Sequence, residues 1–232
     1  MVARYAVYYA AEPGSPLAEF GKHWLGRNGA PENAPLPNIP GISDARMHEL
    51  TSGPRRYGFH GTLKPPFELH PATSLDSLLA AARIFAKSMA PVEMPALELA
   101  IIGKFIALTP ITSSAALENL AAKCVRAFEG YRMPLTDQQI AHYRNNKLTV
   151  HQNSMLEHWG YPYVMEEFRF HISLTERIDD ISERRAVMQV ITEMAKDVVG
   201  KPLTIRDIAV FGQEERDQPM TVIERLPFGR AN

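Results

Sequence analysis

The sequence predicts an α+β protein built from two similar halves. Two observations support this. Polar and apolar residues alternate over 55–69 and again over 166–176, which indicates two strands. Each of these strands is followed by a helical pattern and then by a strand pair that turns at a glycine, Gly103 or Gly212. Blocks of this order favour two antiparallel sheets with helices outside, and a pseudo-symmetric arrangement would set the sheets face to face across a central cleft.

The elements before and after the predicted strand at 55–69 are assigned from residue propensity and from the spacing of apolar residues. Residues rich in β-formers indicate strands, and apolar residues at helical spacing indicate helices. Several prolines indicate a long loop, which in a compact domain is often functional. The expected order is a strand at 3–10, a helix at 15–26, the long loop at 27–54, a helix at 74–90 and a strand pair at 96–111.

The second half is expected to repeat this order after an insertion. Residues 131–165 fit neither half of the repeat and are predicted to be the insertion; Thr136 and Gln139 in it fit a capping box before a short helix. The remaining elements are expected to be helices at 114–129, 148–159 and 182–199 and strands at 203–212 and 219–226.

Composition limits the classes of function. The chain has 232 residues, a formal net charge of −1 and one cysteine, which suits a single domain of residues 1–232 without a disulfide. Near-zero net charge argues against a nucleic-acid coat or a membrane-surface binder. No signal-peptide pattern or membrane-spanning stretch is found, so a soluble cytoplasmic protein is expected. No G-x-x-x-x-G-K-[ST] loop is present to support NTP hydrolysis.

Two short motifs carry the functional prediction. Each consists of a histidine, a spacer, a hydroxyl residue and an aliphatic residue: His60-Gly61-Thr62-Leu63 and His171-Ile172-Ser173-Leu174. A strand points alternate side chains to one face. His60 and Thr62 would therefore share a face, as would His171 and Ser173. The four are predicted to be catalytic, with the imidazoles transferring protons and the hydroxyls donating to phosphate oxygens.

Nearby cations and tyrosines are candidate substrate contacts. By alternation, Arg56 and Lys64 share the face of His60, and Arg169 shares the face of His171. Tyr8 and Tyr163 are assigned to the cleft wall, although tyrosines at such positions are also typical packing residues. No metal ligands are assigned and no cofactor is expected, because no histidine lies in an H-E-x-x-H pattern.

The twin motifs resemble those of the 2H phosphoesterase superfamily, which includes the bacterial RNA 2′,3′-cyclic phosphodiesterases, also called RNA ligase-like proteins. Other strings resemble a bacterial subgroup associated with phosphonate metabolism: RYAVYY at 4–9, EPGSPL at 12–17, WLGR at 24–27, RRYGFH at 55–60 and WGYPYV at 159–164. The resemblance implies a bilobal α+β fold with a concave cleft. It also implies metal-independent hydrolysis of a cyclic phosphodiester, for example phosphoribosyl 1,2-cyclic phosphate, in a genomic setting beside carbon–phosphorus bond cleavage.

Two other functions remain open. One is an RNA-end 2′,3′-cyclic phosphodiesterase or 2′-5′ RNA ligase; the lack of a basic stripe counts against long nucleic acid, and the 27–54 loop and the 131–165 insertion differ from minimal RNA-processing members. The other is a non-catalytic nucleotide-binding module, which would not need two histidines. The expected partner is thus a small phosphorylated or nucleotide-like substrate. The sequence leaves open which histidine is the acid, the oligomeric state, and whether the 27–54 loop and the 131–165 insertion act as lids.

Overall fold

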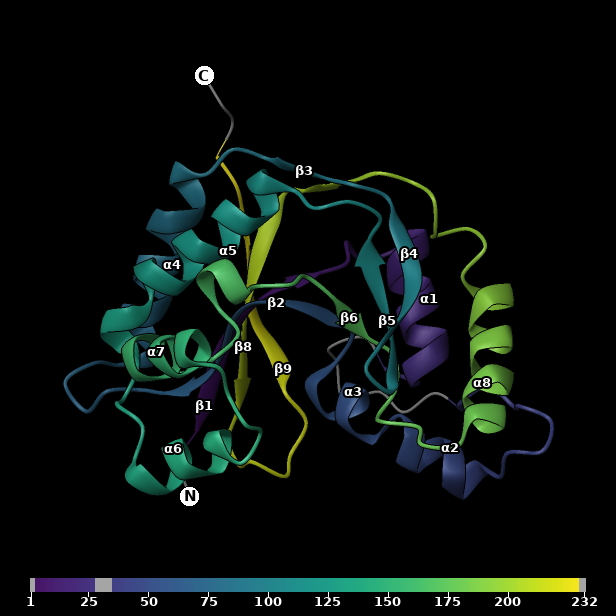
Figure 1. Cartoon of the computed structure of the whole chain (residues 1–232). Coiled ribbons are helices and arrows are strands. Elements are labelled where there is room, and N and C mark those ends of the chain that lie inside the picture. The colour runs from purple at the N-terminus through teal and green to yellow at the C-terminus, as the bar shows by residue number, and fades with distance from the viewer. Residues whose placement is uncertain (1–2, 28–34, 230–232) are drawn as a thin grey trace.

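The computed structural model describes residues 3–27 and 35–229. Within this part of the chain, antiparallel pairing builds a seven-stranded sheet of order β4-β5-β6-β2-β1-β8-β9 and a separate pair β3-β7 (Figure 1). The strands are β1 (Arg4–Ala10), β2 (His60–Glu68), β3 (Val92–Met94), β4 (Leu97–Ile102), β5 (Phe105–Pro110), β6 (Ile172–Ser173), β7 (Leu203–Ile205), β8 (Asp207–Gln213) and β9 (Thr221–Pro227).

The predicted helices are all present, with shifted ends, and α2 and α3 are additional. The α-helices are α1 (Pro16–Leu25), α2 (Asp44–Leu50), α3 (Ser52–Tyr57), α4 (Leu75–Ser88), α5 (Ala115–Ala127), α6 (Asp137–Arg144), α7 (Val150–Trp159) and α8 (Ile181–Met194). Two 3₁₀ turns are η1 (Glu129–Tyr131) and η2 (Met165–Glu167). The predicted capping box of Thr136 and Gln139 begins α6. No helix in the described segments is long and apolar enough to cross a membrane.

The predicted order of strand, helix and strand pair is present as two runs, β2-α4-β3-β4-β5 and β6-α8-β7-β8-β9. The turn predicted at Gly103 is present, but the turn predicted at Gly212 is wrong, because Gly212 lies within β8 and pairs with Thr221 of β9. The hairpins exchange places: β4-β5 pairs with β6, whereas β8-β9 joins the half that contains β2, through β1. The expected α+β class with antiparallel strands is confirmed. The two expected sheets are joined at one point, because Gly61 of β2 pairs with Ile172 of β6. Apart from the separate pair β3-β7, the strands of both halves therefore form one continuous sheet.

The helices pack on one face of this sheet. Val7 and Tyr9 on β1 belong to the main apolar cluster, which includes residues of α1, α4, α5 and α8. Figure 1 shows α4 and α5 beside one half of the sheet and α1 and α8 beside the other. The alternate residues of β1 point to the opposite face, where Ala6 and Tyr8 form a second, small apolar cluster with Phe211 and others. That second face carries the candidate site.

Both motif strands are shorter than predicted. Residues 52–57 form α3, and Gly58, at φ +81°, redirects the chain before β2 begins at His60. The second strand keeps only Ile172 and Ser173, since 165–167 form η2, with Met165 in the left-handed region. The predicted 27–54 loop includes α2 and the start of α3, and its residues 28–34 lie outside the described residues. The insertion at 131–165 contains α6 and α7, and its status as an insertion stays a prediction.

Candidate active site

The two motifs meet where β2 crosses β6. Gly61 and Ile172 are directly opposite each other in an antiparallel pair. The same register sets His60 opposite Ser173 and Thr62 opposite His171, all four on one face. The two histidines are thus diagonal neighbours, for which Cα separations of roughly 7–8 Å are usual. A two-fold axis through the Gly61–Ile172 pair would therefore place one motif on the other.

Glycine at position 61 is required by this crossing. A Cβ atom there would collide with the ring of Phe170, which is buried on the opposite side of the strand pair from the histidines. The ring fills the space left by the missing side chain, and the two strands can then approach closely. The spacer residue of the first motif therefore has a structural role.

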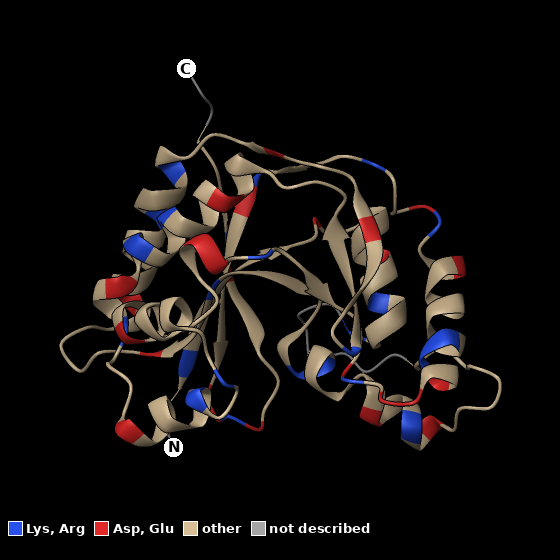
Figure 2. Cartoon of the chain, viewed as in Figure 1, with Lys and Arg blue, Asp and Glu red and all other residues tan. Residues whose placement is uncertain are grey.

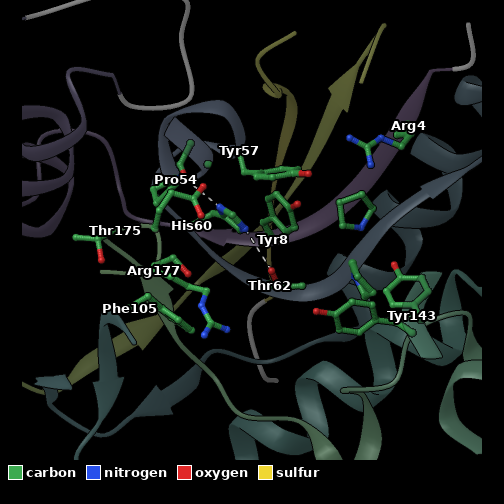
Figure 3. A pocket seen from close by; sticks show the side chains of 17 residues that line it. Arg4, Tyr8, Pro54, Tyr57, His60, Thr62, Phe105, Tyr143, Thr175 and Arg177 are labelled. Atoms are coloured by element: carbon green, nitrogen blue, oxygen red, sulfur yellow. Dashed lines mark hydrogen bonds between the residues drawn. The ribbon is translucent and has the colours of Figure 1, made fainter. Parts of the chain in front are cut away.

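A cavity of about 410 Å³ opens over this crossing, and Figure 3 shows its lining. Of the nine sequence-predicted site residues, His60, Thr62, Ser173 and Tyr8 line it. His171 is outside the lining, with its ring centroid 5.8 Å from that of Phe105, which does line it. The full lining is Arg4, Tyr8, Gly53, Pro54, Tyr57, Gly58, His60, Thr62, Pro65, Pro66, Phe105, Tyr143, Tyr161, Ser173, Thr175, Glu176 and Arg177.

His60 is held in a defined tautomer and is kept neutral. Its Nδ1 donates to the carbonyl of Gly58 at 2.9 Å, so Nδ1 carries the hydrogen and Nε2 is the basic nitrogen. Nε2 lies 3.2 Å from the hydroxyl of Thr62, and the ring of Tyr8 stacks on the imidazole at 3.7 Å. Burial is the main reason that the pKa of His60 falls to about 4, with a smaller contribution from the charge of His171; the Gly58 bond acts in the opposite direction.

His171 is oriented by the same kind of contact. Its Nδ1 donates to the carbonyl of Arg169 at 2.9 Å. Its Nε2 is then the nitrogen available for proton exchange, as in His60. Each histidine of the pair is thus positioned by the backbone carbonyl two residues before it.

Lys64 does not face the cavity, which corrects the alternation argument. Val7 pairs with Lys64 and Tyr8 pairs with Thr62, so Leu63 is an extra residue in β2 and forms a bulge. After the bulge, Lys64 shares the helix-facing side with Val7. Its ammonium is buried under α5, where it donates to the carbonyl of Val125 at 3.1 Å and to Glu129 at 3.0 Å. Burial lowers the pKa of Lys64, which Glu129 partly offsets.

The other predicted contacts also lie elsewhere. Arg56 belongs to α3 and packs over the ring of Tyr57 at 5.1 Å, because the strand expected there is a helix. Arg169 donates to the carbonyls of Glu166 and Phe168 and lines a different cavity. Tyr163 is exposed. Among the described residues, none of Arg56, Arg169 and Tyr163 lines the cavity with His60.

Two arginines that the sequence reading did not select line the cavity instead, Arg177 and Arg4. Both could have been found by extending the alternation. Arg177 follows His171, Ser173 and Thr175 at every second position, and Arg4 precedes Tyr8 by four residues on β1. Figure 3 shows these arginines on opposite sides of the group of labelled residues.

The cavity wall is rich in aromatic rings. Tyr143 and Tyr161 meet edge to face at 5.8 Å, and Tyr57 lies 6.4 Å from the ring of His60. Burial raises the pKa of Tyr143, so its hydroxyl stays protonated at neutral pH. The sequence assigned only Tyr8 and Tyr163 to the cleft wall, because tyrosines such as Tyr143 and Tyr161 are also typical packing residues.

Among the described residues, the only carboxylate in the lining is that of Glu176, which lies over Gly53 and receives a hydrogen bond from Ser52 at 3.5 Å. Three or more His, Cys, Asp or Glu side chains do not cluster anywhere in segments 3–27 and 35–229 in a way that could hold a metal ion. The arrangement thus offers the imidazole of His60, two hydroxyls and two guanidiniums around a space that a small anion could enter, and the imidazole of His171 lies next to it beside Phe105.

Curated proteins similar to this chain are longer than it is. Over 234 residues the chain is 34% identical to ribose 1,5-bisphosphate phosphokinase PhnN of Janthinobacterium sp. (strain Marseille), covering 98% of this chain and 51% of that protein. The protein of the same name from Laribacter hongkongensis (strain HLHK9) is 33% identical over 178 residues, covering 77% and 41%. The chain therefore spans about half the length of these relatives.

Solved structures resemble the fold. TT0787 of Thermus thermophilus aligns with a TM-score of 0.51 and 14% identity, covering 99% of this chain and 100% of that one. E. coli LigT complexed with 3′-AMP aligns with a TM-score of 0.45 and 11% identity, covering 99% and 100%. The alignment with TT0787 shows a shared fold, which agrees with the expected mixture of helices and antiparallel strands.

A family profile gives the assignment. It matches residues 62–221, a segment that includes Thr62, His171 and Ser173 and begins two residues after His60. Because this segment is more than half of the chain, the chain belongs to the family described as protein of unknown function (DUF1045).

Proposed function

We propose that this chain hydrolyses a small cyclic phosphodiester to a phosphomonoester, with His60 and His171 as general base and general acid and with no metal ion. The observation that carries the proposal is the crossing at Gly61 and Ile172, which sets two histidine–hydroxyl pairs diagonally across one face. Phosphodiester hydrolysis needs one group to take a proton from water and another to give one to the leaving oxygen. This pair supplies both.

The environment of each histidine supports a division of roles. The lowered pKa keeps His60 neutral near pH 7, with Nε2 able to accept a proton from the attacking water. As the water oxygen bonds to phosphorus, the bond from phosphorus to one ring oxygen breaks, and that oxygen takes a proton from Nε2 of His171. The hydroxyls of Thr62 and Ser173 donate to the non-bridging oxygens, where charge increases in the transition state.

The size and charge of the cavity favour a sugar phosphate. A volume of about 410 Å³ is in the range of small-ligand sites, and Arg177 and Arg4 supply positive charge. The curated relatives are named for a ribose bisphosphate. That name is a kinase name, but this sequence has no G-x-x-x-x-G-K-[ST] loop. We therefore take from it the class of substrate, a ribose phosphate, and not the reaction.

One observation favours a second candidate, a 2′,3′-cyclic phosphate at an RNA end. Four aromatic side chains line the cavity besides Tyr8, and such rings stack on nucleobases. They are Tyr57, Phe105, Tyr143 and Tyr161. A long RNA is less favoured, because acidic and basic residues are both present on the helices in Figure 2 and the net charge is −1.

A substrate panel with EDTA present tests these proposals. We expect turnover of ribose cyclic phosphates in EDTA, faster than turnover of 2′,3′-cyclic nucleotides or of RNA with cyclic phosphate ends, and none in His60→Gln. Activity abolished by EDTA and restored by a divalent ion would contradict the metal-independent mechanism. Faster cleavage of RNA ends, with tight and steeply salt-dependent RNA binding, would favour the second candidate.

The same panel separates a binding module from an enzyme. Calorimetry with the cyclic phosphates would detect binding without turnover if the fold only binds nucleotides.

Thr62→Val removes the hydroxyl and keeps the side-chain shape, and we expect it to lower kcat by about 10- to 1,000-fold. A phosphorylated Thr62 or Ser173 trapped during turnover would instead show that a hydroxyl is the nucleophile.

A further inference from the structure

We propose that Arg4 binds a second, terminal phosphate of the substrate, so that the site selects a sugar that carries a phosphomonoester in addition to the cyclic phosphodiester. This inference rests on the proposed function, because it assumes that the cyclic phosphate is held at His60 and Thr62. It assigns a role to a residue that the catalytic scheme does not need.

Arg4 lies on the same face of the sheet as the catalytic groups, at the far end of the cavity. It begins β1, and its side chain shares a face with Tyr8, whose ring stacks on His60. Four residues along a strand span about 13 Å between Cα atoms. The arginine side chain can bridge part of that distance, which leaves a span suited to one sugar ring. Figure 3 shows Arg4 beyond Tyr8 and Tyr57 as seen from His60.

Arg4 also stands where two cavities meet. Together with Pro66 and Tyr143, it lines both the first cavity and a second one of about 590 Å³. The second cavity is polar, with Arg132, Arg216, Glu68, His142, Thr136, Gln138 and Gln139 among its lining. A ligand that extends from the cyclic phosphate past Tyr8 would therefore place its other end at Arg4.

The charge of Arg4 is not neutralised by a described carboxylate, unlike the charges of its neighbours. Arg216 pairs with Glu68 at 2.7 Å and Arg132 pairs with Glu129 at 2.9 Å. Arg4 instead donates through Nε and Nη2 to the amide oxygen of Gln213, and it forms no ion pair within the described residues. Its Nη1 makes no hydrogen bond to the described residues and can donate to a phosphate oxygen.

Gln213 fixes the direction of the guanidinium. This buried side chain uses its own amide nitrogen to donate to the carbonyls of Arg216 and Gln218, so its oxygen must point toward Arg4. A neutral partner orients the arginine and leaves its charge available to an anion. A carboxylate at this position would orient it equally well but would cancel the charge that a phosphate needs.

Two matched substrates test the proposal: a ribose cyclic phosphate with a 5-phosphate and the same compound without it. Arg4→Gln should lower kcat/KM for the first about 10- to 100-fold, the usual value of a charge-assisted contact, and change kcat/KM for the second less than about threefold. Arg4→Lys should keep part of the preference. Arg83→Gln, a change at an exposed arginine paired with Glu224, is the control and should alter neither.

The outcomes separate this inference from the proposed function. Equal losses on both substrates, or no loss on either, would overturn the role of Arg4. If neither compound is hydrolysed by the wild-type protein, the proposed function fails, and calorimetry with ribose 5-phosphate still decides the inference. Arg4→Gln should then weaken that binding at least about 10-fold, and unchanged affinity would overturn it. If Arg4→Gln fails to fold, Arg4→Met replaces it. Loss of the preference for the 5-phosphate compound in Arg4→Met would support the role of Arg4, and full retention of the preference would overturn it.

Discussion

His60 and His171 are oriented by the same contact: each ring donates its Nδ1 hydrogen to the backbone carbonyl two residues earlier, at 2.9 Å in both cases. Both rings therefore present Nε2 as the nitrogen that exchanges protons. Their surroundings differ, because Tyr8 stacks on His60 at 3.7 Å whereas Phe105 meets His171 at a tilt of 52°. In the proposed reaction, equal orientation in unequal environments would let the two like groups take opposite roles in acid–base catalysis.

The first prediction concerns removal of either ring. His60→Gln and His171→Gln should each lower kcat by about 10²- to 10⁴-fold, the usual contribution of a general acid or base. The double variant should lose much less than the product of the two factors, since the groups act in one reaction. His158→Gln, at an exposed histidine of α7, is the control. Full activity in either single variant on a substrate that the wild type turns over would exclude the pair.

The pH dependence of kcat/KM should report the environment of His60. The pKa of about 4 places the acid limb of the profile near pH 4, below which the base is protonated. Tyr8→Ala should admit water to the imidazole and move this limb upward toward about 6.5, the ordinary value for histidine. Tyr8→Phe keeps the stacked ring and removes only the hydroxyl, which contacts the sulfur of Met220, so its limb should not move. An unshifted limb in Tyr8→Ala would show that burial by this ring is not the cause.

The same shift makes a prediction about stability. The pKa of His60, about 4 in the folded chain, is lower than the value near 6.5 of an unfolded chain. Between about pH 4 and 6.5 the unfolded state therefore binds more protons, and acidification through this window should cost up to roughly 3 kcal/mol of unfolding free energy. Urea unfolding at about pH 7 and pH 4.5 measures this. The fall should be smaller in His60→Gln, and an equal fall in both proteins would assign it to other groups.

The sequence could predict what depends on local pattern. The two motifs, the capping box at Thr136 and the strand–helix–strand-pair order are all local, and the structure contains each of them. Extending the alternation would also have found Arg177 and Arg4. The site itself joins residues far apart in the chain, and the sequence could predict it only because the motif occurs twice.

What sequence could not predict is where alternation fails. One extra residue, Leu63, turns Lys64 to the other face of β2, and Pro65 and Pro66, which lack N–H groups, add a second irregularity to the pairing with β1. Nothing in the spacing of polar residues reveals a bulge. The partner that stabilises Lys64 in its actual position, Glu129, is 65 residues away.

The corrected position of Lys64 leads to a further prediction. Lys64→Met should keep near-wild-type kcat/KM and change the unfolding free energy by less than about 2 kcal/mol, because an apolar side chain can replace a buried ion pair. Glu129→Ala should be more harmful, at about 2–3 kcal/mol, because it leaves a buried ammonium without its carboxylate. Urea unfolding and steady-state kinetics check both variants. A loss of kcat/KM above about 10-fold in a folded Lys64→Met protein would restore Lys64 as a substrate contact.

The last prediction tests the crossing that brings the motifs together. A Cβ at Gly61 would overlap the ring of Phe170, so Gly61→Ala should force β2 and β6 apart and cost about 1–3 kcal/mol of stability. Because His60 and Thr62 flank Gly61, kcat should fall as well. Gly130→Ala is the matched control, since a Cβ there meets nothing within 4 Å. The double variant Gly61→Ala with Phe170→Leu relieves the overlap and should recover part of both losses. Wild-type activity in Gly61→Ala, or no recovery in the double variant, would show that close approach at this residue does not set the geometry of the site.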